Sequence, residues 1–203
     1  MSLKLSRLNA TRVILAVRLR KKGEAARASI EAASNRKNVV EVWQVDVSDY
    51  HSIQDFVAKF NSLDRLDVVV ANAGVLKNTY EELGGTEITV KVNVIGTFLL
   101  VVNILPMLRR SREKTGQTAR LIITSSVMHE DVRSPLRDLV ICKAHDKQAK
   151  FAERHDISIF DAFNKGNKGN KSYISDRYNN SKLLEVFLTR SIAAAMHKGP
   201  HAT

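Results

Sequence analysis

The sequence has very little cysteine and proline, and it lacks a long hydrophobic run. Cys142 is the only cysteine among 203 residues, which excludes an intrachain disulfide framework and a cysteine-based metal cluster and favours a reducing, intracellular compartment. Three prolines, 44% hydrophobic residues and 26% charged residues are typical of a soluble α/β protein. The length fits one globular domain, and we expect a single domain over 1–203.

The sequence also gives no support for a membrane protein, a secreted protein or a metal-binding protein. The longest apolar stretch, 98–108, is interrupted by Asn103 and Pro106 and is shorter than the roughly 20 residues that span a bilayer, so it predicts a buried helix. The N-terminus has no apolar signal core, and a cytoplasmic location is expected. The six histidines show no ligand spacing, so we expect no metal.

The net charge of +11 raises the question of nucleic acid, because clustered basic residues bind polyanions. Here the lysines and arginines are scattered, and only 18–22 forms a tight run. That run follows an apolar segment, where a phosphate-bearing cofactor could use it equally well. We expect no nucleic-acid partner; a steep salt dependence of binding would be the mark of one.

Apolar strand patterns alternate with amphipathic helix patterns along the chain. Strands are predicted at 12–17, 39–45, 66–71 and 119–124, and helices at 21–33, 51–63, 88–108 and 181–195. This alternation predicts βαβ units and a parallel sheet. The segment 132–171 interrupts it with weak periodicity and a polar run, which indicates an insertion or lid.

A serine pair and a tyrosine–lysine pair could carry chemistry. Ser125 and Ser126 end a predicted strand, and the four-residue spacing of Tyr178 and Lys182 places them on one helix face. Tyrosine, with an ordinary pKa near 10, is protonated at neutral pH, and a nearby cation favours the phenolate. With a serine holding a carbonyl, the set suits the proton transfer that accompanies hydride transfer. Taken alone, such a tyrosine–lysine pair is more often a solvated helix face.

Further motifs in the same order make the chain similar to the short-chain dehydrogenase/reductase family. The matching segments are Asp46-Val47 after the second strand, Asn72-Ala73-Gly74 after the third, Asn93 in the following helix, Ser125-Ser126, and Tyr178-x-x-x-Lys182. The similarity runs from about residue 5 to residue 195 and is closest to fungal members found in secondary-metabolite gene clusters.

The resemblance implies a Rossmann-like, doubly wound parallel sheet and catalysis by Tyr178 as the acid/base. Lys182 would lower the pKa of the tyrosine and hold the nicotinamide ribose. Ser126 would orient the substrate carbonyl, with Ser125 as the alternative, and Asn93 would support a proton relay. The implied function is an NADP(H)-dependent oxidoreductase acting on a carbonyl or alcohol of a secondary metabolite; the alternative is an inactive remnant or binding protein of the same fold.

The resemblance also implies a cofactor site. Its residues would be Arg18, Asp46, Val47, Asn72, Ala73, Gly74, Tyr178 and Lys182. Arg18 follows the first predicted strand, where it would meet an adenosine 2′-phosphate and where an acidic residue would have selected NAD. NADPH is therefore favoured over NADH. The alternative for Arg18 is a solvated surface arginine without a cofactor role, and the alternative for Asn72 is an asparagine that only forms a turn beside Gly74.

Compared with the family pattern, the first strand and its glycine loop are missing. Residues 2–10 resemble only the last turns of the helix after that loop, and the chain ends before the family's last core strands. The missing strand would lie between 12–17 and 66–71, so two strand edges would be unpaired. We expect an incomplete domain from a gene model that lost exons; replacement contacts in a homo-oligomer are the alternative.

The interval between Ser126 and Tyr178 is unusually long for this family. Fungal relatives carry an insertion resembling 149–164, whereas 132–148 does not resemble them. We hypothesise that 132–148 is a retained intron in translation, in which case Cys142 is a stray thiol.

Overall fold

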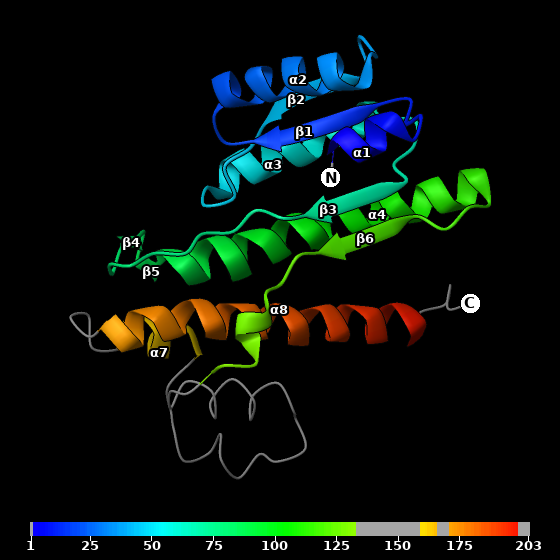
Figure 1. Ribbon diagram of the computed structural model, residues 1–203. Helices are drawn as coiled ribbons and strands as arrows, with labels where there is room; N and C mark the ends of the chain where they lie inside the picture. Colours follow the sequence, from blue (N-terminus) through cyan, green and yellow to red (C-terminus); the bar gives the residue numbers. More distant parts are fainter. Residues whose placement is uncertain (1, 133–158, 166–170, 199–203) are drawn as a thin grey trace. The chain divides into compact units, whose positions relative to one another are not determined.

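The computed structural model describes residues 2–132, 159–165 and 171–198, and it divides the chain into two compact units, Met1–Leu63 and Asp64–Thr203. Each unit contains one pair of parallel strands joined by a helical crossover (Figure 1). Strands that alternate with helices and pair in parallel are what the sequence predicted, and they define an α/β fold.

The first unit is a parallel strand pair with helices packed on it. Its elements are α1 (Ser2–Arg7), β1 (Val13–Val17), α2 (Arg20–Ser34), β2 (Val40–Gln44), α3 (Tyr50–Ala58) and the 3-10 helix η1 (Lys59–Ser62). β1 and β2 pair from Val13 opposite Val40 to Val17 opposite Gln44. Buried Val13 and Val40 pack with Leu5 of α1 and Ile30 of α2, so the core lies between the strands and these two helices.

Gly23 explains how closely α2 approaches the strands. A Cβ atom at this position would lie 2.5 Å from Cγ1 of Val42 and 2.7 Å from Cγ2 of Val17, closer than carbon atoms pack. The packing of α2 on both strands therefore requires glycine, although a glycine inside a helix costs about 1 kcal/mol relative to alanine.

A polar cap and aromatic packing fix α3. Asp49 accepts a hydrogen bond from the backbone N–H of His51 at 3.0 Å, which satisfies a donor of the first turn. The rings of Phe56 and Phe60 pack edge to face with their centres 5.2 Å apart, and the indole of Trp43 on β2 lies 5.9 and 5.8 Å from them. The amphipathic helix predicted here is confirmed, with its last turn tightened into η1.

The second unit contains the other strand pair and the longest helices. Its elements are β3 (Val68–Ala71), β4 (Glu82–Leu83), β5 (Thr86–Glu87), the π-helical segment η2 (Val90–Gly96), α4 (Thr97–Thr115), β6 (Arg120–Ile123), the 3-10 turn η3 (Val127–His129), α7 (Ile159–Lys165) and α8 (Lys171–Lys198). β3 and β6 pair in parallel, from Val68 opposite Arg120 to Ala71 opposite Ile123. α8 packs against η2 and against η3, the turn that follows β6 (Figure 1).

η2 and α4 form one continuous helical segment, Val90–Thr115, where the sequence predicted a helix at 88–108. Val90 and Val101 are completely buried and Ile104 is 2% exposed, so its inward face belongs to the core of this unit. The segment is long and apolar enough to cross a membrane, but 61% of its most apolar stretch is buried inside the protein. The prediction of a buried helix is confirmed.

Two features of the second unit were not predicted. α8 begins at Lys171, well before the predicted start at 181. The prediction missed its early turns because they bury polar residues such as Asp176 and Arg177, which give no hydrophobic pattern. The hairpin β4–β5 turns through Gly84 and Gly85, both at positive φ. Strands of two residues are too short to show an alternating pattern.

Most of the predicted insertion, 132–171, lies outside the described residues, as do Cys142 and nearly all of the proposed intron segment 132–148. The part that is described is packed: Phe163 of α7 is completely buried against Val90, Val94 and Leu184. α7 therefore contributes to the core of the second unit, although the sequence offered only a weak pattern there.

In the described part of the chain, the two strand pairs are separate sheets. β1 pairs with β2 within the first unit, and β3 pairs with β6 within the second.

Candidate active site

The carboxyl ends of β3 and β6 lead directly into residues that the sequence singled out. Asn72-Ala73-Gly74 follows β3, and Ser125-Ser126 follows β6. Because the strands are parallel, both segments leave the sheet at the same edge, which is where ligands bind in open α/β sheets. α8 supplies Tyr178 and Lys182 to this edge through its contact with η2 and η3.

Lys182 is the point at which these segments meet. Its ammonium Nζ donates a hydrogen bond to the backbone oxygen of Thr124 at 3.3 Å, at the end of β6. A Cβ atom at Gly74 would lie 3.4 Å from the same Nζ, so the loop after β3 passes close to the ammonium and leaves room for it by having no side chain there. The Nζ atom is 5.6 Å from the ring centre of Tyr178, one turn away on α8. The structure therefore brings Gly74, Tyr178 and Lys182 together as the sequence predicted.

Asn93 ties the loop after β3 to α8. Its side-chain oxygen accepts from the backbone N–H of Val75 at 2.7 Å, and its Nδ2 donates to the Val75 carbonyl at 3.0 Å. The same Nδ2 donates to Oγ of Ser181 at 3.0 Å, next to Lys182. Asn93 is completely buried, and its amide has partners on both sides. Its visible role is therefore to fix the loop that carries Gly74 relative to α8.

The two serines have different partners. The Ser125 hydroxyl donates to the backbone oxygen of Lys182 at 3.0 Å, which joins the end of β6 to α8. The Ser126 hydroxyl accepts from the backbone N–H of Met128 at 3.3 Å and caps η3. A hydroxyl that accepts one bond still has its own proton to donate. The geometry therefore favours Ser126 over Ser125 for contact with a substrate carbonyl.

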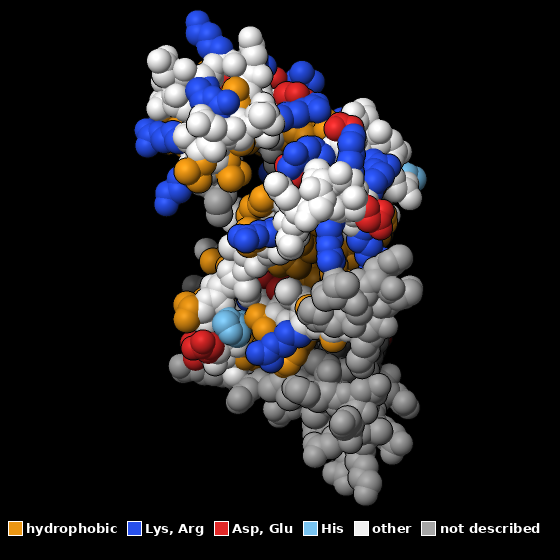
Figure 2. Space-filling model, turned by 90° about the vertical axis from the view of Figure 1, so that its right-hand side faces the viewer, with side chains coloured by type: hydrophobic (Ala, Val, Ile, Leu, Met, Phe, Trp, Pro, Cys, Tyr) orange, Lys and Arg blue, Asp and Glu red, His pale blue; other side chains and the backbone are white. Residues whose placement is uncertain are grey.

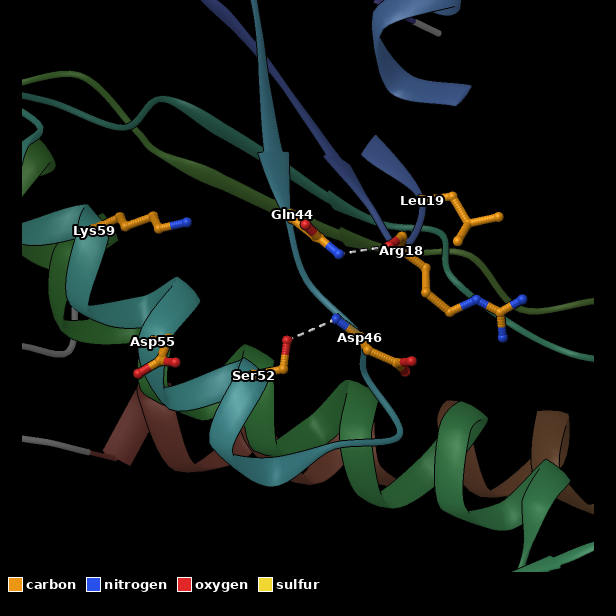
Figure 3. A pocket seen from close by; sticks show the side chains of 7 residues that line it. All are labelled: Arg18, Leu19, Gln44, Asp46, Ser52, Asp55 and Lys59. Carbon is orange, nitrogen blue, oxygen red and sulfur yellow. Dashed lines mark hydrogen bonds between the residues drawn. The ribbon is translucent and has the colours of Figure 1, made fainter. Parts of the chain in front are cut away.

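A second candidate site lies in the first unit, at the carboxyl ends of β1 and β2 (Figure 3). An open pocket of about 570 Å³ is lined by Arg18, Leu19, Gln44, Asp46, Ser52, Asp55 and Lys59. Arg18 directly follows β1, and its backbone oxygen accepts a hydrogen bond from Nε2 of Gln44 at 3.1 Å. Two cationic and two anionic side chains thus line a mixed polar pocket of a kind suited to a charged, hydrogen-bonding ligand.

Asp46 is held rigidly in this pocket. Its Oδ1 accepts from the backbone N–H of Ser48 at 2.9 Å and from the Ser48 hydroxyl at 2.6 Å, while its own N–H donates to Oγ of Ser52 at 2.9 Å. These bonds fix the turn into α3, which carries Val47 as a half-buried residue. Sequence reasoning missed Ser52 and Asp55 of α3 and Lys59 at the start of η1, although their helical spacing along one face was a usable signal.

Comparison with protein-family models shows which family the chain belongs to. The family model described as short chain dehydrogenase matches residues 1–135, about two thirds of the chain. The chain belongs to the short chain dehydrogenase family. The resemblance stated from its motifs is thereby confirmed.

Fungal relatives carry the same family name. The chain is 40% identical over 192 residues to "Short chain dehydrogenase atnD" of Emericella nidulans, a match that covers 95% of this chain and 55% of that protein. It is 36% identical over 181 residues to "Short chain dehydrogenase FGM9" of Gibberella zeae, covering 89% and 47%. The chain spans about half the length of these curated relatives.

Solved structures confirm the predicted Rossmann-like fold. The NADH-dependent reductase A1-R′ complexed with NAD superimposes with a TM-score of 0.64 at 17% identity, over 97% of this chain and 66% of that one. A short-chain dehydrogenase from Sphingobium yanoikuyae in complex with NADPH gives 0.61 at 15% identity, over 95% and 59%. At such identities the likeness concerns the fold alone.

Proposed function

We propose that this chain is part of an NADP(H)-dependent oxidoreductase that acts on a carbonyl or alcohol group of a small molecule. The observation that carries the proposal is the meeting of three separate segments of the chain near the Lys182 ammonium. Gly74 after β3, Thr124 at the end of β6 and Tyr178 on α8 all lie against its ammonium. A set of family residues gathered on one cation is suited to holding a polar ligand and moving a proton beside it.

The chain's own residues divide this work. Tyr178 would exchange a proton with the substrate oxygen, with the Lys182 ammonium close to its ring. Ser126 would donate a hydrogen bond to the same substrate oxygen from the start of η3. Asn93 would hold the loop of Gly74 in place rather than touch the substrate. A bound nicotinamide cofactor would supply the hydride.

NADP(H) rather than NAD(H) is proposed from the pocket of the first unit. Arg18 stands directly after β1 and lines the pocket (Figure 3), and its guanidinium is a bidentate cation of the kind that suits a 2′-phosphate. Asp46 lies in the same pocket, but one of its carboxylate oxygens already accepts two bonds from Ser48. Asp46 and Val47 would border the adenine, and Asn72 and Ala73 would lie along the cofactor by family analogy.

The substrate and the setting are proposed from the relatives. Fungal relatives named as short chain dehydrogenases support a fungal small molecule, and we propose a secondary metabolite as its class. We propose a cytoplasmic enzyme, allow for a homo-oligomer, and expect no nucleic-acid or membrane partner. Figure 2 shows lysine and arginine side chains on one face among side chains of other types.

The alternative, an inactive remnant that only binds a partner, is the weaker proposal. The contacts of Lys182 with Gly74 and Thr124 preserve the arrangement that the chemistry needs. For 132–171 we still propose an insertion, and for 132–148 a retained intron. A full-length transcript that encodes 132–148 would overturn the intron.

The activity is tested by following NADPH oxidation in the presence of a panel of small ketones and quinones, with Tyr178→Phe as the matched variant. We expect consumption by the wild type with at least one carbonyl class and a rate lower by about 100-fold or more in Tyr178→Phe. Equal rates in both proteins would contradict the role of Tyr178.

A further inference from the structure

Lys182 has a partner that the family motif does not include. Its Nζ lies 2.8 Å from Oε1 and 3.1 Å from Oε2 of Glu185, three residues further along α8. The side chains of Lys182 and Glu185 are only 6% and 1% exposed. This pair is therefore a buried ion pair at the centre of the candidate active site, unlike the exposed ion pairs elsewhere on the described surface.

The surroundings hold this pair in one geometry. The backbone oxygen of Thr124 accepts another bond from the ammonium, and the backbone of Gly74 passes close enough that a Cβ atom there would lie 3.4 Å from Nζ. Burial raises the pKa of Glu185 above its ordinary value, and the Lys182 ammonium opposes that rise, with a smaller contribution from the nearby Ser125 hydroxyl. Tyr178 on the same helix lies beside the ammonium, with its ring centre 5.6 Å from Nζ, and η2 contributes the neutral Asn93, whose side-chain oxygen would lie 3.4 Å from a Cβ atom at Gly74, as the ammonium would.

Because the pair is buried, the position of the Lys182 ammonium depends on the Glu185 carboxylate. A charge buried without its partner costs several kcal/mol, so a lysine that lost Glu185 would turn toward solvent if its chain allowed it. The ammonium would then leave Gly74 and the Tyr178 ring. The position that the proposed chemistry requires of Lys182 thus depends on a residue that touches neither substrate nor cofactor.

We propose that Glu185 is a positioning residue, whose buried carboxylate holds the Lys182 ammonium between Thr124 and Gly74, where the ammonium binds the nucleotide. This rests on the proposed function, because a nucleotide must be the ligand. Glu185 acts through Lys182 alone. Its negative charge is the property that matters, so aspartate is the conservative replacement and glutamine removes the charge at equal size.

The first test measures NADPH binding by calorimetry in the wild type, Glu185→Gln and Glu185→Asp. Glu81→Gln is the matched control, because Glu81 forms an exposed ion pair with Lys77 on the surface. We expect Glu185→Gln to weaken binding by about tenfold or more and Glu185→Asp to restore most of the affinity. The control should bind like the wild type. Unchanged affinity in Glu185→Gln, beside a wild type that binds, would overturn the positioning role alone.

The second test needs no nucleotide and remains valid if Glu185→Gln is destabilised or if the wild type binds no NADPH. In protein labelled with ¹⁵N-lysine, the ammonium resonance of Lys182, identified by its loss in Lys182→Met, should be visible and protected from exchange. It should disappear or shift in Glu185→Gln and persist in Glu185→Asp. A resonance unaffected by Glu185→Gln would overturn the proposal, whereas a wild type that shows this behaviour without binding NADPH would overturn the proposed function instead.

Discussion

The amide of Asn93 forms two hydrogen bonds with the backbone of one residue, Val75: it accepts from the N–H at 2.7 Å and donates to the carbonyl at 3.0 Å. The asparagine side chain thus pairs with the loop as a neighbouring strand would, because it satisfies both backbone polar groups of one residue. Through Ser181 it also reaches the neighbour of Lys182. The loop that carries Gly74 and the helix that carries Lys182 are thus joined by one side chain.

Asn93→Ala should destabilise the protein strongly. The change leaves the half-buried N–H and carbonyl of Val75 without these partners, and an unsatisfied polar group costs about 1–3 kcal/mol when it is fully buried. We expect a loss of about 2–4 kcal/mol in the free energy of unfolding, measured by urea denaturation. Asn103→Ala is the control, because Asn103 is exposed on α4 and its side-chain amide donates to the Leu99 carbonyl of its own helix. Similar small losses in both variants would contradict the account.

Gly23→Ala should loosen α2 from the strands of the first unit. The added methyl would meet Val42 and Val17 at 2.5 and 2.7 Å, so the helix or the strands must shift. Overpacking of this kind costs about 1–3 kcal/mol, which outweighs the gain in helix propensity of about 1 kcal/mol. A thermal melt should show a lower Tm for Gly23→Ala, and a Tm equal to or above that of the wild type would show that the close approach is not required.

Glu185 should make the protein less stable as the pH rises. Burial raises the pKa of Glu185 above its ordinary value of 4.5. The folded state then holds the proton more tightly than the unfolded state does, so the group's stabilising contribution is complete below pH 4.5 and is lost as the pH rises through the folded pKa. Urea unfolding measured at a series of pH values from below 4.5 upward should show the free energy of unfolding of the wild type falling relative to that of Glu185→Gln. A difference that is flat with pH would argue against the raised pKa.

Arg18→Ala should lower affinity for NADPH much more than affinity for NADH. A hydrogen bond between guanidinium and phosphate is charge-assisted and contributes about 1.5–3 kcal/mol, or about 10- to 100-fold in affinity. Lys59 lines the same pocket, so Lys59→Ala is the control that removes a positive charge there without removing the arginine. We expect Lys59→Ala to have the smaller effect in calorimetric titrations. Equal losses for both cofactors in Arg18→Ala would mean that this arginine does not read the 2′-phosphate.

Periodicity was sufficient to predict the framework of this fold. The four strands were predicted because runs such as 66–71 and 119–124 are short, apolar and bounded by polar residues, as buried parallel strands are. α8 was predicted too short, because its early part buries Asp176 and Arg177, and burial of polar residues leaves no hydrophobic pattern. The hairpin β4–β5 depends on a glycine turn and two short strands, which is a weak signal in any single sequence.

The candidate site was predicted by motif rather than by pattern. Order along the chain led to Gly74, Tyr178 and Lys182, and the structure places them together. Order could not reveal Glu185, because an acidic residue three positions after a lysine on a helix is usually a solvated pair. Only the packing of α8 against the strand ends shows that this pair is buried.

The most direct test of the whole account is calorimetric titration of the 203-residue chain with NADPH, with NADH as the control. The account predicts saturable NADPH binding, weaker binding of NADH, and a large loss of both affinities in Lys182→Met. Absence of NADPH binding by the folded wild-type chain would contradict the proposal that these residues form a nucleotide-dependent reductase site.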